Sequence, residues 1–251
     1  MLHCRERQLS SDLRNIMWKG KSVSIIFPTF NEKDSIKAAI EDFFASGYVD
    51  EVIVVNNNAA EGTHEEVAKT KAKEVFEKKQ GYGYSLMRGL DEATGDIIIL
   101  SEPDGTFLGR DVIKLLAYSD DFHCVFGTRT STFLIGEGAN MGLFLKWGNV
   151  FLAKIIEVLY NTTLLTDVGC TMRLIDRKSL DRIRKYLTVG GSHFGVQMML
   201  VIIKLNVGFI EVPLNYKKRV GESTVTGSTW KAFVLGVQML GLIVNYKFIR
   251  L

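Results

Sequence analysis

Cysteine and proline are scarce in this chain of 251 residues, which contains only three of each. Cys4, Cys124 and Cys170 are too scattered for a disulfide framework or a zinc-binding motif, so we expect a reducing, cytoplasmic compartment. The prolines are isolated, and neither a Pro/Ser-rich linker nor an internal repeat divides the sequence. The length suits one large α/β domain or two small ones, with ample residues for a core.

Long apolar runs and a strong charge bias are also missing. No stretch reaches the roughly 18 uninterrupted apolar residues that a membrane-spanning helix needs. Residues 1–21 form a polar N-terminal extension without the apolar core of a signal peptide. The formal net charge of +3 is too small to argue for nucleic-acid binding, although it suits an anionic surface if the charge is localised.

Short β-branched runs alternate with helical periodicity along the chain. This alternation predicts an α/β fold with βαβ units and a mainly parallel sheet that has helices on both faces. The predicted strands are 23–27, 51–55, 73–76, 96–100, 124–127, 173–175 and 207–212. The predicted helices are 35–46, 63–72, 84–94, 111–119, 143–160, 178–185, 194–205 and 230–246.

The strand predicted at 96–100 leads into two carboxylates, Glu102 and Asp104, on either side of Pro103. Such a strand delivers its acids to the carboxyl edge of the sheet, where open α/β sheets bind ligands. Oxygen ligands at this spacing suit Mg²⁺ or Mn²⁺ held together with the phosphates of a substrate. The same residues are also ordinary turn formers, so an acidic turn explains this segment equally well.

Polar residues follow the first two strands as well. Pro28, Thr29, Asn31 and Glu32 follow the first strand, and Asn56 and Asn57 follow the second. At the edge of the sheet these groups are placed to meet the ribose and base of a nucleotide. A helix cap would explain Asn31, and consecutive asparagines are also good turn composition.

Two glycines and several cations complete the candidate set. Gly81 and Gly83 permit close backbone approach before a helix N-terminus. Arg129 follows a strand, and Arg219 lies in a basic loop; the guanidinium fork suits phosphate. A solvated basic patch is the alternative for both arginines.

In their order along the chain, these segments resemble the family-two inverting glycosyltransferases, which share the GT-A fold. The chain looks closest to the dolichyl-phosphate mannose synthase branch and its polyprenyl-phosphate relatives. Residues 23–32 resemble the opening strand with its Pro-x-x-Asn-Glu signature, and residues 95–104 resemble the strand that ends in the Asp-x-Asp metal site. Residues 167–173 resemble the acceptor-side segment, and residues 219–223 resemble the Arg-x-Gly-x-Ser-Lys loop over the diphosphate. The resemblance covers residues 22–228, followed by an apolar C-terminal helix at 229–251.

The resemblance implies metal-dependent, inverting transfer of a sugar from a nucleotide-diphospho-sugar, such as a UDP- or GDP-sugar. The acceptor it implies is a polyprenyl (dolichyl-type) phosphate or a growing surface glycan. Asp104 and Glu102 are the implied ligands of Mg²⁺ or Mn²⁺. The implied donor-binding residues are Pro28, Thr29, Asn31, Glu32, Asn56, Asn57, Gly81, Gly83, Glu102, Pro103, Asp104, Arg219 and Ser223.

The resemblance also implies an acceptor site. Arg129, with Lys146 or Arg173, would position a lipid phosphate, which is already an anion and needs no strong base. A sugar hydroxyl would need a general base, and Asp167 is the candidate. Asp104, Asp167 and Arg129 are therefore the expected catalytic residues.

Three positions depart from the family pattern. Asn56 replaces an Asp that accepts from the base, which leaves the base identity open. Glu102 replaces the first Asp of the metal pair, so Asp104 is the firmer ligand. Thr224 replaces a Lys of the diphosphate loop. These departures keep open an inactive nucleotide-sugar-binding protein. A sugar nucleotidyltransferase is a further alternative, although the glycine-rich loop with Arg or Lys that it needs after the first strand is absent.

The helices predicted at 143–160 and 230–246 carry broad apolar faces with cations near their ends. Interfacial helices have this composition, and so do helices buried in a core or in contact with a second subunit. Peripheral contact with the cytoplasmic face of a membrane, burial and homo-oligomer formation are all compatible with the pattern.

Overall fold

The structure is a computed structural model that describes residues 18–139, 142–221 and 228–251. Most of the predicted polar extension, 1–21, lies outside the described residues. Ser223 and Thr224, from the expected diphosphate loop, lie outside them as well.

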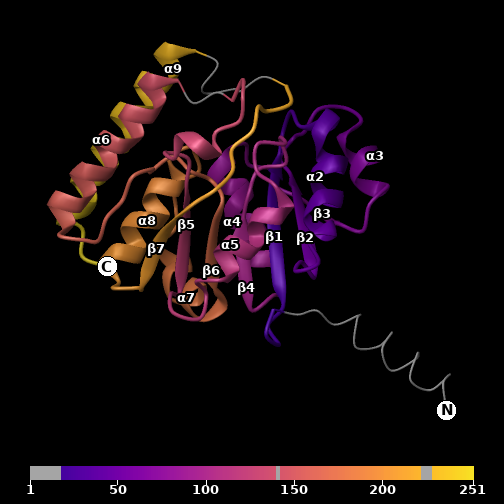
Figure 1. The fold of residues 1–251 in the computed structure, drawn as a ribbon, viewed down its shortest axis with the longest axis horizontal. Coiled ribbons are helices and arrows are strands. Elements are labelled where there is room, and N and C mark those ends of the chain that lie inside the picture. Colours follow the sequence, from indigo (N-terminus) through magenta and orange to yellow (C-terminus); the bar gives the residue numbers. More distant parts are fainter. Residues whose placement is uncertain (1–17, 140–141, 222–227) are drawn as a thin grey trace.

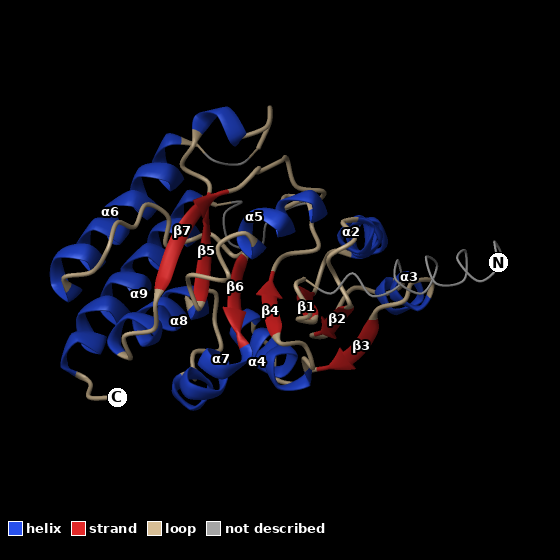
Figure 2. Cartoon of the chain, turned by 60° about the horizontal axis from the view of Figure 1, so that its bottom comes forward, coloured by secondary structure: helices blue, strands red, loops and turns tan. Residues whose placement is uncertain are grey.

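One sheet organises the described residues, with seven strands in the order β3-β2-β1-β4-β6-β5-β7 (Figures 1 and 2). Six strands run in one direction and β6 runs against its neighbours β4 and β5. The mainly parallel sheet is confirmed. The strands are β1 (Val23–Thr29), β2 (Glu51–Asn56), β3 (Lys73–Phe76), β4 (Ile97–Leu100), β5 (Cys124–Thr128), β6 (Arg173–Asp176) and β7 (Phe209–Pro213).

The reversal of β6 was not predicted, and it has a direct consequence for the ligand edge. Because β6 is antiparallel, its first residue, Arg173, pairs with Leu100, the last residue of β4. A strand start therefore lies where the parallel strands end. The carboxyl edge of the sheet gains a cation from β6 in addition to the groups that follow β1, β2, β4 and β5.

Helices cover both faces of the sheet, as the alternating pattern predicted (Figure 1). Alternate strand residues face two separate cores: Ile25 and Phe27 lie in one, and Ile26 lies in the other. β1 is buried along its whole length because both of its faces are covered. One face carries α2 (Lys33–Ala45), α3 (Thr63–Ala68) and α5 (Val112–Leu116); the other carries α4 (Tyr82–Glu92), α7 (Arg177–Ile183) and α8 (Phe194–Lys204).

Two longer helices, α6 (Leu143–Tyr160) and α9 (Thr229–Phe248), form an outer pair on the α8 side (Figure 1). Their C-terminal ends are joined, since the Tyr160 hydroxyl donates to the Ile243 carbonyl at 2.7 Å and Lys247 donates to the Leu159 carbonyl. α9 buries Met239, Ile243 and Tyr246 in the same core as the sheet. The helix expected at 229–251 ends at Phe248 and packs on the core of the sheet. Within the residues described, no helix is long and apolar enough to cross a membrane.

A buried glutamine connects this outer pair to the sheet edge. Gln197 of α8 accepts hydrogen bonds from the backbone N–H groups of Thr188 and Val189, at 2.9 and 2.8 Å. Its amide group donates to the Tyr246 hydroxyl of α9. The loop before α8 and the C-terminal half of α9 are therefore held by one side chain.

Close packing of α4 on the sheet gives a stability prediction. An added Cβ at Gly89 would lie 2.3 Å from the stiff, β-branched side chain of Ile26. We expect Gly89→Ala to lower the free energy of unfolding by about 1–3 kcal/mol, measured by urea denaturation. The control is Gly241→Ala in α9, where an added Cβ meets nothing within 4 Å. Helix propensity should make this second change neutral or stabilising by up to about 1 kcal/mol. Equal effects of the two changes would contradict the packing argument.

Candidate functional site

The loop after β1 is held by a carboxylate at the start of α2. Glu32 Oε2 accepts from the backbone N–H groups of Phe30 and Asn31, at 2.7 and 2.9 Å. The Thr29 hydroxyl lies 3.3 Å from the same oxygen. Pro28, Thr29, Phe30 and Glu32 line the main pocket of the protein. Asn31 is not among the residues that line it.

The two asparagines after β2 have different surroundings. Asn56 donates to Glu74 at 2.9 Å and accepts from the Ala59 N–H at 2.9 Å, and it does not line the pocket. Asn57 does line the pocket. Its amide nitrogen donates to the carbonyls of Glu77 and Lys79, and its oxygen accepts from the Gly81 N–H at 2.8 Å. Both amides hold the polypeptide, and Asn57 is the one that a ligand in the pocket would reach.

The glycines at 81 and 83 allow close approach to another segment of the chain. An added Cβ at Gly83 would lie 2.0 Å from the Val189 carbonyl oxygen, and one at Gly81 would lie 2.4 Å from that of Gly190. The Gly83 N–H donates to the Gly190 carbonyl at 2.8 Å. Tyr82, between them, lines the pocket, whereas the two glycines do not. Their packing role accounts for the pattern that predicted a ligand loop.

Of the residues after β4, Glu102 and Pro103 line the pocket, whereas Asp104 does not. Asp104 is 1% exposed. Its Oδ1 accepts from the backbone N–H and the hydroxyl of Thr106, at 2.9 and 2.5 Å. Its Oδ2 is buried and has no hydrogen-bond partner within the described residues. Desolvation, followed by the charge of Asp104, raises the pKa of Glu102 to about 8.

Arg219 connects the ends of β1 and β4. Its Nη2 lies 3.5 Å from Glu32 Oε1 and 3.4 Å from Asp104 Oδ2. Its Nε is buried without a hydrogen-bond partner in the part of the chain that the structure describes. Arg219 lines the pocket and retains donor capacity at Nε.

Arg129 and Asp167 form a bidentate ion pair. Arg129 Nε and Nη2 donate to the two carboxylate oxygens at 2.8 and 2.9 Å, and the Arg129 N–H donates at 3.0 Å. The Gly169 N–H adds a fourth hydrogen bond to Asp167, which is fully buried. Glu211 of β7 accepts from the backbone N–H groups of Thr166 and Asp167, at 2.7 and 2.9 Å, and so fixes the segment.

The other two predicted acceptor residues differ in position. Arg173 is buried and lines the pocket, but its guanidinium donates to the backbone carbonyls of Cys170 and Gly195. Burial lowers its pKa from the ordinary value. Lys146 lies in the first turns of α6 and is not part of the pocket lining.

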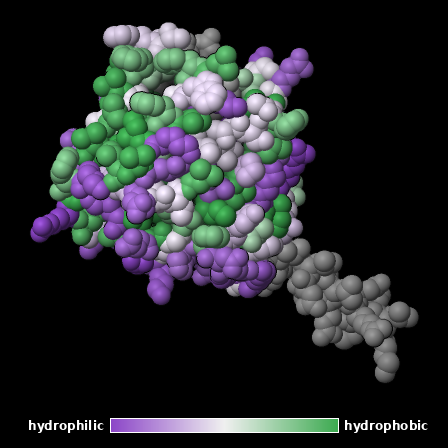
Figure 3. Space-filling model, turned by 60° about the vertical axis from the view of Figure 1, so that its left-hand side comes forward, coloured by the Kyte–Doolittle hydropathy of each residue, from purple (hydrophilic) through white to green (hydrophobic). Residues whose placement is uncertain are grey.

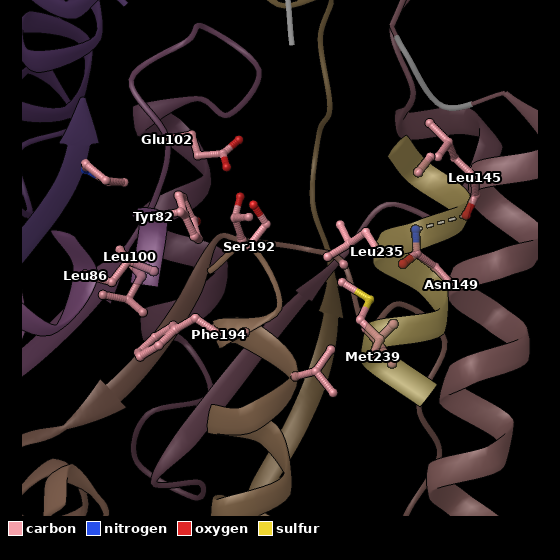
Figure 4. Close-up of a pocket in the computed structure, with 18 of the residues that line it drawn as sticks. Tyr82, Leu86, Leu100, Glu102, Leu145, Asn149, Ser192, Phe194, Leu235 and Met239 are labelled. Carbon is pink, nitrogen blue, oxygen red and sulfur yellow. Dashed lines mark hydrogen bonds between the residues drawn. The ribbon is translucent and has the colours of Figure 1, made fainter. Parts of the chain in front are cut away.

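A pocket of about 670 Å³ with two chemically distinct ends is lined by part of this set: Pro28, Thr29, Glu32, Asn57, Glu102, Pro103, Arg129, Arg173 and Arg219. Figure 4 shows Glu102, Tyr82 and Ser192 near one another at the polar end, and Leu145, Leu235 and Met239 at the other. Leu145 comes from α6, and the other two apolar residues come from α9. The pocket therefore connects the acidic strand end to the space between α8 and the outer helices.

Several pocket residues were missed by sequence reasoning. Tyr82 faces the acidic pair, and burial followed by the charge of Glu102 raises the pKa of its hydroxyl well above the ordinary value. Its place between two glycines was a usable signal. Asn149 is a polar residue on the wall that α6 contributes, and Ser192 follows two glycines before α8. Their distance in sequence from the strand ends concealed them.

Comparison with known proteins assigns this chain to a family. The family model described as glycosyl transferase family 2 matches residues 24–184. A low-salt glycan biosynthesis hexosyltransferase, Agl6, from Haloferax volcanii is 27% identical over 213 residues, which cover 81% of this chain and 50% of that protein. An uncharacterized glycosyltransferase from Mycobacterium bovis is 33% identical over 101 residues, or 40% of this chain and 45% of that protein. The chain spans about half the length of these curated relatives.

A solved structure has the same fold. Glucosyl-3-phosphoglycerate synthase from Mycobacterium tuberculosis, in complex with Mn²⁺, UDP and phosphoglyceric acid, aligns with a TM-score of 0.69. The alignment covers 92% of this chain and 80% of that chain at 16% identity. This likeness shows the fold, which is the GT-A arrangement expected from the sequence. With the family model matching more than half of its residues, the chain belongs to glycosyl transferase family 2.

Proposed function

We propose that the protein transfers a sugar, with the help of a divalent metal, from a nucleotide-diphospho-sugar to a phosphate group carried on an apolar chain. The observation that carries this proposal is a continuous pocket that has an acidic, arginine-lined end and an apolar end. Donor binding at the polar end agrees with the family. Family membership also favours this reaction over nucleotidyl transfer.

The surroundings of Asp104 Oδ2 support a metal at the donor end, because this oxygen has the Arg219 guanidinium at 3.4 Å but no hydrogen-bond partner within the described residues. A buried carboxylate oxygen without a hydrogen-bond partner is costly unless a ligand satisfies it. No group of three or more acidic, His or Cys side chains gathers in the described ranges, so Asp104 and Glu102 would share Mg²⁺ or Mn²⁺ with water and the donor diphosphate. Bound there, the metal would stabilise the charge that develops on the leaving diphosphate.

The side chains of this chain supply the remaining steps of the proposed reaction. An acceptor phosphate oxygen attacks the anomeric carbon, the bond from that carbon to the diphosphate oxygen breaks, and the nucleoside diphosphate leaves with the electron pair. Arg219, beside Asp104, would hold the leaving diphosphate. An anionic acceptor transfers no proton, so no general base is required. Inversion at the anomeric carbon follows the family resemblance.

The bonding of Asp167 favours a positioning role over that of a base. Both of its oxygens already accept hydrogen bonds from Arg129, and it is fully buried. Arg129 lines the pocket and would meet the acceptor phosphate in the orientation that Asp167 sets. Arg173, held by backbone carbonyls, would add positive charge to the same floor.

The apolar end of the pocket supports a lipid-linked acceptor such as a polyprenyl phosphate. Its walls include Leu145, Leu152, Leu235 and Met239, which would leave the hydroxyl groups of a glycan without hydrogen-bond partners. An acceptor of the dolichyl-type branch would place its phosphate near Arg129 and its chain among these residues. Cys124 and Cys170 are buried free thiols, which agrees with a reducing compartment such as the cytoplasm.

A binding experiment tests the donor class. In thermal unfolding with Mn²⁺, we expect sugars of one base (UDP, GDP or dTDP) to raise the midpoint by roughly 5–10 °C at about 100 times the dissociation constant. UDP-sugars are the first choice because the solved relative of the same fold binds UDP. The absence of any shift with all three classes would contradict donor binding.

The metal role is tested by Asp104→Asn, which keeps an acceptor oxygen for Thr106 but removes the charge. With saturating Mg²⁺ or Mn²⁺, we expect transfer to fall by about 100-fold or more, because charge stabilisation of the leaving group is lost. Asp104→Ala should behave alike. Asp121→Ala, an exposed acid outside the pocket, is the matched control. Activity of either Asp104 variant within a few-fold of the parent would show that the metal assignment is wrong.

The positioning role of Asp167 predicts a specific kinetic pattern. We expect Asp167→Asn and Arg129→Lys each to raise KM for the acceptor by about tenfold, with KM for the donor nearly unchanged. The double variant should lose less than the sum of the two, because both changes break one ion pair. A base role would instead lower kcat by about 10²–10⁴-fold and remove the acidic limb of the pH profile. Steady-state kinetics across pH distinguishes these outcomes.

A further inference from the structure

The N-terminal halves of α6 and α9 present a group of large apolar side chains to solvent. We call this surface the collar. Its members are between 51% and 76% exposed, a high value for side chains of this type. The collar consists of Leu143, Phe144, Trp147, Phe151, Trp230 and Phe233.

The parallel pairing of the two helices brings these residues together. The contacts from Tyr160 to Ile243 and from Lys247 to Leu159 fix the C-terminal ends of both helices side by side. Both N-termini therefore lie at the other end of the pair, at the top of Figure 1, where the parallel strands end. Trp230 stacks on Phe233 with ring centroids 5.8 Å apart.

The collar surrounds the opening of the apolar end of the pocket. Phe144, Phe151 and Phe233 line the pocket and are also 59%, 62% and 51% exposed. A side chain that both lines a pocket and faces solvent marks its mouth. The apolar end of the pocket thus opens onto an apolar outer surface instead of onto a polar one.

One cation belongs to the same helix turn as part of the collar. Lys231 follows Trp230 in the first turn of α9. Figure 3 shows hydrophobic side chains spread over this side of the molecule above a hydrophilic lower edge. Aromatic side chains beside lysines are the composition of surfaces that bind the boundary between headgroups and acyl chains.

From these observations we propose that the collar is a membrane-docking surface that seats on a bilayer containing anionic lipid. Docking there would place the mouth of the pocket in the acyl region, so that an apolar acceptor enters sideways from the bilayer. This inference rests on the proposed function, since it names where the acceptor comes from. A second copy seated on the collar would close the same mouth, which makes the membrane the better occupant.

The test is flotation of the full chain with vesicles of phosphatidylcholine, with and without phosphatidylglycerol. We expect flotation with the anionic vesicles, weakened by salt. The double variant Trp147→Glu/Trp230→Glu alters two exposed collar residues that do not line the pocket. We expect it to bind these vesicles on the order of tenfold more weakly or worse. The matched control is Phe248→Glu, which changes an 81% exposed aromatic at the far end of α9 and should float like the parent.

Three results would overturn the docking proposal. One is a parent protein that stays soluble with both kinds of vesicle. Another is a Phe248→Glu variant that loses binding as fully as the double variant. The third is a parent dimer, seen by light scattering, that the double variant converts to a monomer without any vesicle binding.

Transfer to a water-soluble, short-chain prenyl phosphate separates this inference from the proposed function. We expect the double variant to keep that activity while losing transfer to a long-chain acceptor in vesicles. Soluble transfer without vesicle binding would overturn the docking proposal alone. Vesicle binding without any transfer would contradict the proposed function and leave the surface assignment standing.

Discussion

The antiparallel pairing of β6 between β4 and β5 is the constraint on which the site depends. It places Arg173 directly beside Leu100, at the point where the acidic segment begins. It also makes β4 and β5 second neighbours in the sheet, so that Arg129 after β5 and Glu102 after β4 line one pocket. A parallel β6 would begin at the opposite edge, and the floor of the pocket would lose its third arginine.

The charged groups around this pocket are of two kinds: those that already form hydrogen bonds with each other, and those that still lack hydrogen-bond partners. Arg129 and Asp167 neutralise each other through two side-chain hydrogen bonds. Around Asp104 the balance is different, because Oδ2 and Arg219 Nε lack hydrogen-bond partners within the described residues. Buried polar groups in proteins usually have hydrogen-bond partners, so a charged ligand would add the most stabilising interactions at Asp104 and Arg219. A metal and a diphosphate together would satisfy both the acid and the arginine.

The helices and strands could be predicted because periodicity is local; α6, for example, has the predicted bounds. The direction of β6 could not be predicted, since nothing in the sequence between Arg129 and Arg173 indicates whether the next strand runs parallel or antiparallel to β5. At the site, Asp104 was identifiable as an acid after a buried strand. Gly81 and Gly83 show why patterns mislead: a glycine that admits a ligand and one that admits Val189 look identical in sequence. Tyr82 reaches the pocket only because that packing directs it there.

The two halves of α9 have different surroundings. Its C-terminal half is fixed to the core through Tyr246 and Gln197, and Gln197 also holds Thr188 and Val189, which support Gly83. Its N-terminal half carries the exposed Trp230 and the mouth of the pocket. The apolar wall that α9 contributes and the loop that packs against Gly83 therefore share one anchor, the buried Gln197 side chain.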